Sequence, residues 1–124
     1  MATRNLHGVR HHLLLCNGGS CMKRGGEEVT QGIREQIANL AADDLIHTTR
    51  TRCNGRCADA CVVIQYPEGI WYQDMTAETG KQLINRIVSG EAAYDAHNIT
   101  YTYQKGEFLP AQQAEIGGTK KQPS

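Results

Sequence analysis

The chain of 124 residues lacks long apolar runs, an excess of either charge, and the apolar core of a signal peptide. No run approaches the roughly 20 apolar residues of a membrane-spanning helix, so we expect no membrane partner. Its 13 Lys and Arg balance its 13 Asp and Glu, whereas a nucleic-acid partner would favour a basic excess. The N-terminus MATRNLHGVRHH contains no hydrophobic segment, so we predict a cytoplasmic protein.

The motifs of substrate catalysis are also missing. The sequence has no glycine motif that cradles a phosphate, no nucleophile–base pair and no helix carrying paired carboxylates. It has no C-x-x-C pair before a helix, which a thioredoxin-type thiol exchanger would need. We therefore predict that the chain is not an enzyme in its own right.

What the sequence does contain is five cysteines in two groups. Cys16 and Cys21 enclose an Asn-Gly-Gly-Ser segment directly after three leucines, and Cys53, Cys57 and Cys61 lie at four-residue spacing before an apolar run. In the cytoplasm structural disulfides are disfavoured, and such groups more often bind metal or do redox work. An odd count of five agrees with four ligands and one spare thiol.

Two kinds of metal centre are compatible with this spacing. Structural zinc sites usually pair their ligands as C-x2-C to C-x4-C, and a C-x4-C followed by a C-x3-C lies at the edge of that range. A 2Fe-2S cluster requires four thiolates, here supplied by two loops. The spacing favours the cluster and leaves zinc open.

Hydrophobic periodicity predicts an α/β fold with the element order β-α-β-β-β-α. The four strands are expected over residues 13–16, 45–51, 61–66 and 70–73. A first helix over 27–41 places Val29, Ile33 and Ile37 on one face, and a second over 77–89 has Thr76 as its N-cap. This length predicts a single domain.

The C-terminal region differs in character from the rest. Residues 99–103, ITYTY, alternate in polarity and are expected to add an edge strand or to pack against a second copy of the chain. Beyond Phe108 the composition is that of disorder. We therefore divide the chain into a domain over 1–90, with a loose leader at 1–6, and an extension over 91–124.

The element order, the C-x4-C after the first strand, and CNGRC leading into VVIQYPEGIWY resemble the thioredoxin-like 2Fe-2S ferredoxins. That family includes the small cluster-bearing subunit of the respiratory NADH dehydrogenase, and the resemblance covers residues 13–90. It implies a thioredoxin-like fold with a central mixed four-stranded sheet and two helices. It also implies one 2Fe-2S cluster per chain, one-electron transfer to a redox partner protein, and a homodimer. Short-loop relatives look like accessory donors in bacterial cofactor pathways such as cobalamin synthesis.

The ligand pattern of the family maps onto four thiols of this chain: Cys16, Cys21, Cys53 and Cys57. Family members usually keep Gly-Pro four residues after the last ligand, where this chain has Ala60-Cys61. Cys61 is therefore either a spare buried thiol or an alternative ligand. If residues 57–61 form one helical turn, its sulfur shares a face with that of Cys57.

Three arginines, Arg50, Arg52 and Arg56, flank the second cysteine group. A cluster held by four thiolates is anionic, so a nearby cation raises its reduction potential. We predict that at least one of these arginines approaches the cluster, and that the arginines raise its potential and form a docking face for an acidic partner. The alternative is that they are ordinary solvated side chains at the end of a strand.

The competing class of function is a thioredoxin-like module that holds zinc or a cluster for a structural, sensing or metal-delivery role. Redox activity separates this class from the electron carrier when the metal is zinc, because zinc has no redox chemistry. A sensor or scaffold would instead show a labile cluster that transfers to other proteins.

Overall fold

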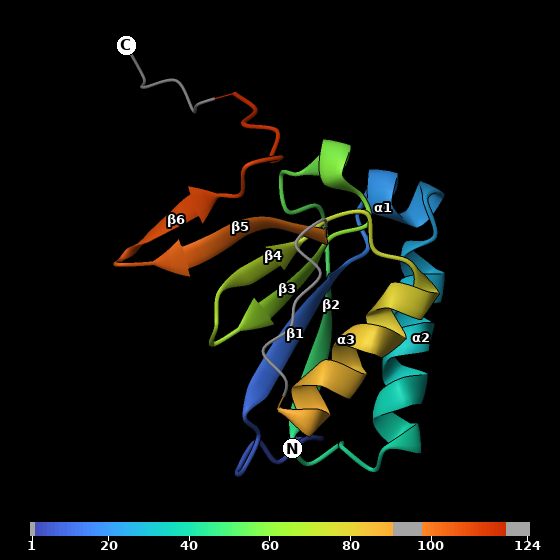
Figure 1. Cartoon of the computed structure of the whole chain (residues 1–124). Coiled ribbons are helices and arrows are strands. Elements are labelled where there is room, and N and C mark those ends of the chain that lie inside the picture. Colours follow the sequence, from blue (N-terminus) through green and yellow to red (C-terminus); the bar gives the residue numbers. More distant parts are fainter. Residues whose placement is uncertain (1, 91–97, 119–124) are drawn as a thin grey trace.

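The computed structural model describes residues 2–90 and 98–118 (Figure 1). Its strands are β1 (His11–Cys16), β2 (Ile46–Thr51), β3 (Val63–Tyr66), β4 (Ile70–Tyr72), β5 (Ile99–Gln104) and β6 (Glu107–Pro110). Its helices are α1 (Gly19–Lys23), α2 (Gly26–Asn39) and α3 (Ala77–Ser89), with one 3-10 turn, η1 (Cys57–Asp59).

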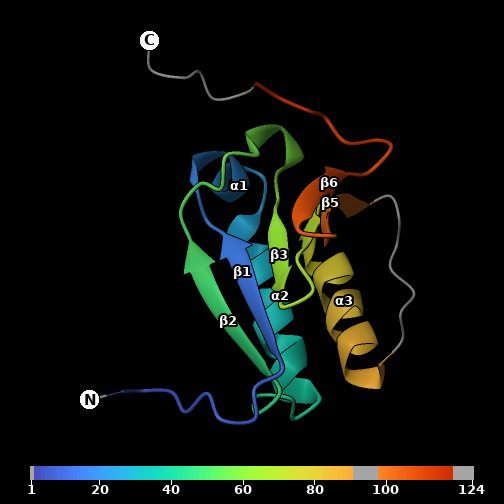
Figure 2. The ribbon, with the colours of Figure 1, turned by 90° about the vertical axis from the view of Figure 1, so that its left-hand side faces the viewer.

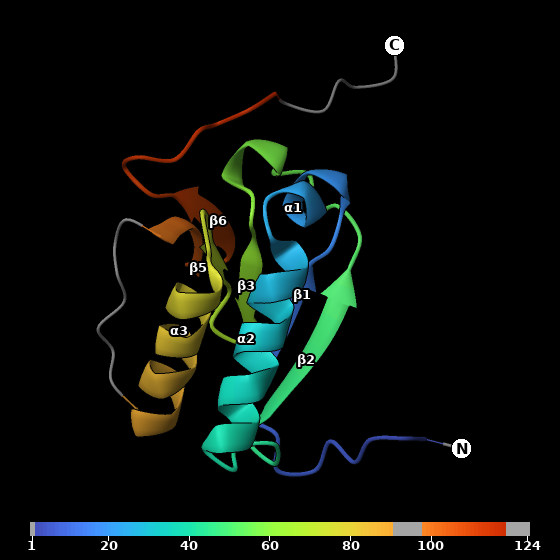
Figure 3. The same ribbon diagram turned by 90° about the vertical axis from the view of Figure 1, so that its right-hand side faces the viewer.

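The strands form one mixed sheet in the order β2-β1-β3-β4-β5-β6. β1 and β2 are parallel, and every other neighbouring pair is antiparallel. The long helices α2 and α3 lie together over one face of the sheet, as views from opposite sides show (Figures 2 and 3). No described helix is both long and apolar enough to span a membrane.

The core lies between the sheet and these two helices. Leu13 and Leu15 alternate along β1 and are buried, and they share one apolar cluster with Ile33 of α2 and Ile84 of α3. The alternation on the strand and the helical spacing on α2 and α3 bring these side chains to a common layer. The helix predicted over 77–89 is confirmed as α3, which begins with a Thr76 capping box and ends at Gly90 in the left-handed conformation.

The sheet has six strands rather than the four predicted. The segment predicted as an edge strand becomes β5, which pairs with β4 on one side and β6 on the other, so it lies inside the sheet. Disorder beyond Phe108 stays a prediction, although Leu109 and Pro110 belong to β6 and residues 111–118 are described without a helix or strand. Phe108 lies in β6 and meets the rings of Trp71 and Tyr103 edge-on, at centroid distances of 6.0 and 5.0 Å. Residues 119–124 lie outside the described residues.

The glycine-rich segment between Cys16 and Cys21 is only partly a loop. Helix α1 already begins at Gly19. This helix places Cys21 on its buried side. A second segment of interest, residues 111–118, follows β6 and is called here the C-terminal segment. Its first N–H, on Ala111, donates to the Thr100 carbonyl at 2.8 Å.

Candidate metal centre

Two cysteine-bearing loops meet at one end of the sheet because β1 and β2 run in parallel. Cys16 ends β1 opposite Thr51, which ends β2. The chain leaving β1 forms the inner loop (residues 16–21), and the chain leaving β2 forms the outer loop (residues 53–57). The Asn17 N–H donates to the Thr51 carbonyl at 2.8 Å and joins the two strand ends. In Figure 1 both loops lie at the same end of the molecule, beside α1 and η1.

A glycine allows the two loops to pack against each other. A Cβ added at Gly18 would lie 2.7 Å from both the Cα and the backbone nitrogen of Cys53. A side chain at this position would therefore push the outer loop away. Gly26, at the start of α2, similarly leaves room for the Cys21 carbonyl oxygen, which would lie 2.9 Å from a Cβ there.

The four predicted ligands surround one small pocket. Cys16, Cys21, Cys53 and Cys57 all line it, together with Gly18 and Ser20. Cys16 and Cys21 are 5% and 2% exposed, whereas Cys53 and Cys57 are exposed. The sulfurs of the exposed pair lie 3.5 Å apart.

The donor set fits a 2Fe-2S cluster better than a single metal ion. Within residues 2–90 and 98–118, no three Cys, His, Asp or Glu side chains stand close enough together to hold one ion. A 2Fe-2S cluster makes a different demand, because each of its irons takes two protein ligands. An inner pair and an outer pair of thiols facing one pocket supply that arrangement.

The pKa values of Cys21 and Cys57, one thiol from each pair, are shifted in opposite directions. Burial raises the pKa of the Cys21 thiol to about 12, and the neighbouring Cys16 adds a smaller contribution in the same direction. Hydrogen bonds from Cys53 and Ser20 lower the pKa of the Cys57 thiol. Iron binds thiolates, so binding of a cluster at Cys21 must displace the proton of this thiol.

Cys61 lies outside this pocket, on its inner side. It is 2% exposed, and its Sγ donates to the carbonyls of Cys21 and Arg24 at 3.4 and 3.3 Å. The helical turn considered over 57–61 does not form, because η1 ends at Asp59 and Ala60 has an extended ψ of 136°. Burial raises the pKa of the Cys61 thiol.

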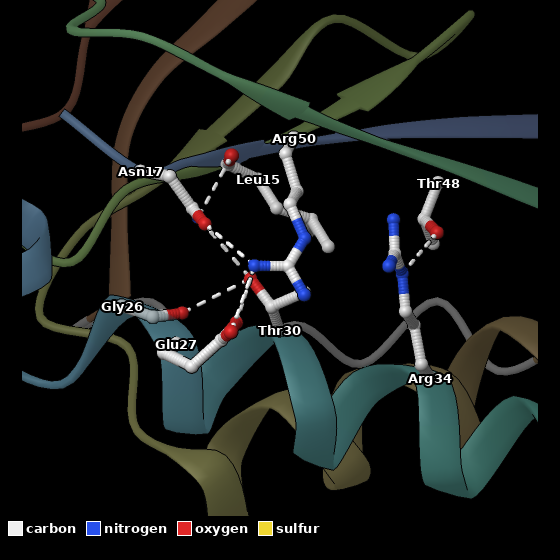
Figure 4. Close-up of polar contacts among 8 residues, drawn as sticks. All are labelled: Leu15, Asn17, Gly26, Glu27, Thr30, Arg34, Thr48 and Arg50. Carbon is white, nitrogen blue, oxygen red and sulfur yellow. Dashed lines mark hydrogen bonds and ion pairs between the residues drawn. The ribbon is translucent and has the colours of Figure 1, made fainter.

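The three arginines make different contacts around the site. Arg50 points toward α2, where it pairs with the Glu27 carboxylate and donates to Asn17 Oδ1 at 3.2 Å (Figure 4). Arg56 pairs with the buried Asp59, Nε to Oδ2 at 2.7 Å. Arg52 is exposed and has no side-chain partner among the described residues. Arg56 is also among the residues that line the pocket of the four thiols. The arginine docking face stays a prediction, and Arg52 is the member of the three whose side chain has no partner among the described residues.

Sequence reasoning missed the hydrogen bonds that order the outer loop. The Gly55 N–H donates to Cys53 Sγ at 3.3 Å, and the side chain of Asn54 donates to Thr51 Oγ1 at 2.7 Å. Gly55 has a φ of +80°, a conformation that glycine adopts without strain. The Asn-Gly pair between the two cysteines was the available signal, because this pair is typical of tight turns.

A mixed sheet covered by helices on one face, with two thiol loops at one end, defines a small thiol-ligated protein of thioredoxin-like topology. Residues 4–88 match the family described as thioredoxin-like 2Fe-2S ferredoxin. The chain belongs to this family. The resemblance seen in the motifs is thereby confirmed, and the cofactor is a 2Fe-2S cluster rather than zinc.

Individual relatives support the same assignment. A protein of Priestia megaterium, provisionally named a 2Fe-2S ferredoxin, is 44% identical over 98% of this chain and 94% of its own length. A 2Fe-2S ferredoxin of Clostridium pasteurianum is 28% identical over 66% of this chain and 89% of its own. The solved thioredoxin-like 2Fe-2S ferredoxin of Aquifex aeolicus shares the fold, with a TM-score of 0.71 at 23% identity over 85% of this chain and 98% of that one. As ferredoxins are electron carriers, this chain is an iron–sulfur electron carrier and not an enzyme.

Proposed function

We propose that Cys16, Cys21, Cys53 and Cys57 hold the cluster and that the chain carries single electrons to a partner protein that docks at this end of the sheet. The observation that carries the proposal is the pocket that all four thiols line and that Cys61 does not. A bound 2Fe-2S cluster supplies one-electron redox chemistry at that place. Cys61 is then the spare buried thiol, which behaves as a small apolar side chain.

The burial of the thiols indicates where the partner docks. The inner pair is shielded by the core, and the outer pair reaches the surface. A partner therefore approaches closest to the cluster over the outer loop. Arg52 is the unpaired cation at that surface, so we propose that the partner presents an acidic residue there.

Three finer parts of the proposal concern the setting of the protein. A reducing cytoplasm suits its free thiols, and we propose that it works there as a homodimer. The pathway stays a prediction, because none of the names of the relatives specifies cobalamin synthesis. One relative, at 26% identity over 69% of this chain, is a component of the NADH-quinone oxidoreductase of Rhizobium meliloti, and the match spans 32% of that component.

The test begins with anaerobic purification, followed by absorption spectroscopy and low-temperature EPR after reduction by dithionite. We expect a coloured protein that is EPR-silent as isolated and shows an S = 1/2 signal when reduced, with two irons per chain. Serine variants of the four ligands should each change or abolish this signal. Cys61→Ala is the matched control and should leave it unchanged.

Two results would contradict the ligand assignment. One is a Cys61→Ala protein that loses its iron. The other is a serine variant of a proposed ligand whose absorption and EPR spectra match those of the parent protein. Sedimentation of the cluster-loaded protein tests the homodimer separately, and a monomer at micromolar concentration would remove that part alone.

A further inference from the structure

The backbone of Arg56 is part of the outer loop, whereas its side chain contacts η1 and β5. Its Nε donates to Asp59 Oδ2 at 2.7 Å, and its guanidinium carbon lies 5.0 Å from the centre of the Tyr101 ring on β5. Its Nη2 also lies 3.5 Å from Thr100 Oγ1. A single side chain in the middle of the outer loop therefore contacts η1 and β5 together.

The same guanidinium holds the C-terminal segment. Its two Nη atoms donate to the backbone carbonyls of Glu115 and Ile116, the latter at 3.5 Å. Figure 1 shows this segment passing from β6 toward η1 at the cluster end of the sheet. Tyr101, Glu115 and Ile116 all lie outside residues 4–88 that match the family. Arg56 thus connects the outer loop of the family core to an extension of this chain.

Close apolar packing does not make this connection. An open pocket of about 300 Å³ lies between the outer loop, the aromatic side chains of Trp71 and Phe108, and Gly118 of the C-terminal segment. Arg56 and Tyr101 also line this pocket, and the directional contacts of the guanidinium link the loop to the extension beside it. Arginine is suited to this task, since its planar fork presents several donors in fixed directions.

The ion pair at the centre of this link is shielded from water. The side chains of Arg56 and Asp59 are 15% and 4% exposed. Thr100 Oγ1 donates to the same carboxylate oxygen at 3.3 Å. A buried pair of this kind is costly to break, because removing one partner leaves the other charge uncompensated. Arg56 is therefore fixed in place, unlike the exposed Arg52.

We propose that Arg56 is a positioning residue that couples the C-terminal segment to the outer loop, so that the docked segment determines how firmly Cys53 and Cys57 hold the cluster. The coupling itself is a property of the protein fold. Only its effect on the cluster rests on the proposed ligand set.

Hydrogen exchange followed by mass spectrometry tests the coupling on the full chain, with and without the cluster. In Arg56→Gln we expect exchange to rise together in peptides covering residues 53–57 and 111–118, by at least about fivefold, while peptides of α2 stay protected. The cluster half-life in the presence of a chelator should fall by a similar factor, and the reduction potential should shift. Arg52→Gln removes a charge next to the outer loop without touching the C-terminal segment, so it is the matched control and should leave exchange and half-life unchanged.

A second variant guards against unfolding caused by the unpaired Asp59. Arg56→Gln/Asp59→Asn removes both charges, and we expect it to fold while still releasing both segments together. Unchanged exchange at 111–118, or a uniform rise that includes α2, would overturn the coupling. Joint release with an unchanged cluster half-life would overturn the effect on the cluster. Because exchange is also measured without the cluster, failure of the coupling is distinguishable from failure of the ligand assignment.

Discussion

The inner and outer thiol pairs are held by different kinds of structure. Cys16 and Cys21 lie on β1 and α1 and are part of the apolar core. Cys53 and Cys57 lie on an exposed loop that is ordered by local hydrogen bonds, such as Gly55 N–H to Cys53 Sγ. The stability of the whole domain therefore fixes the inner pair, whereas a few polar contacts fix the outer pair. We infer that the first pair anchors the cluster and the second exposes it to a partner.

The largest expected effect comes from replacing one proposed ligand of each pair by serine. Cys21→Ser should leave at least about tenfold less bound iron than the parent protein, because a buried ligand cannot shift to accommodate the shorter bond to oxygen. Cys57→Ser should retain most of its iron with an altered absorption spectrum, because an exposed loop can move. Iron analysis and absorption of the two purified variants measure the difference. Equal loss of iron from both variants would contradict the inferred difference between the inner and outer thiol pairs.

The next effect is the reactivity of the thiols in the cluster-free protein. With a pKa of about 12, Cys21 has a thiolate fraction on the order of 1 in 10,000 at pH 8. The pKa of Cys57 is lowered, and this thiol is exposed. We expect iodoacetamide to modify Cys57 first and Cys21 last, at rates that differ by at least about 100-fold. Peptide mass spectrometry over time measures the order, and prompt labelling of Cys21 would contradict the burial of the inner pair.

A smaller effect is expected at the contact between the two loops. Gly18→Ala introduces a Cβ 2.7 Å from the Cys53 backbone, an overlap that costs about 1–3 kcal/mol of folding free energy or moves the outer loop. We expect reduced cluster occupancy after reconstitution and a shorter cluster half-life. Gly19→Ala is the matched control, because a Cβ there meets nothing within 4 Å. Equal behaviour of the two variants would show that the loops are not held in contact.

The smallest effect concerns the surface charge beside the outer pair. Arg52→Gln should slow oxidation of the reduced protein by ferricyanide about twofold at low ionic strength, because it removes attraction for an anion. Oxidation by hexaamminecobalt(III), a cation, should not slow. Stopped-flow absorption measures both rates. Arg50→Gln is the comparison variant, because Arg50 is already paired with Glu27. Equal slowing of ferricyanide oxidation in the two variants would show that Arg52 does not attract the anion more than Arg50 does.

The parts of the fold that sequence reasoning predicted well depend on local signals. Helix α3 was predicted over its full length because Thr76, an apolar stripe and Gly90 define its start, face and end within one short stretch. The two cysteine groups were recognisable for the same reason, since loop spacing is a local property. The ends of the strands were less well predicted, and β3 begins at Val63 rather than at Cys61.

The parts that were missed depend on contacts between distant residues. Phe108 becomes part of a strand because it pairs with Tyr103 and meets Trp71. The polar composition of the C-terminal residues does not indicate either partner. Arg56 looked like a surface cation beside a cluster. Its partners at Thr100 and Glu115 lie 44 and 59 residues further along the chain.

The sequence by itself determined the family, the cofactor class and the helices around the core, because motif spacing and hydrophobic periodicity are properties of short continuous stretches of the chain. Only the tertiary structure decided which thiols face one pocket, where Cys61 points and which arginine keeps a free charge. The parallel pairing of β1 with β2 brings Cys16 and Cys53 to one end of the sheet. After η1 ends at Asp59, Cys61 lies outside that pocket, with its sulfur against the Cys21 carbonyl. Both results depend on the path of the backbone through space, which the spacing of residues along the chain does not specify.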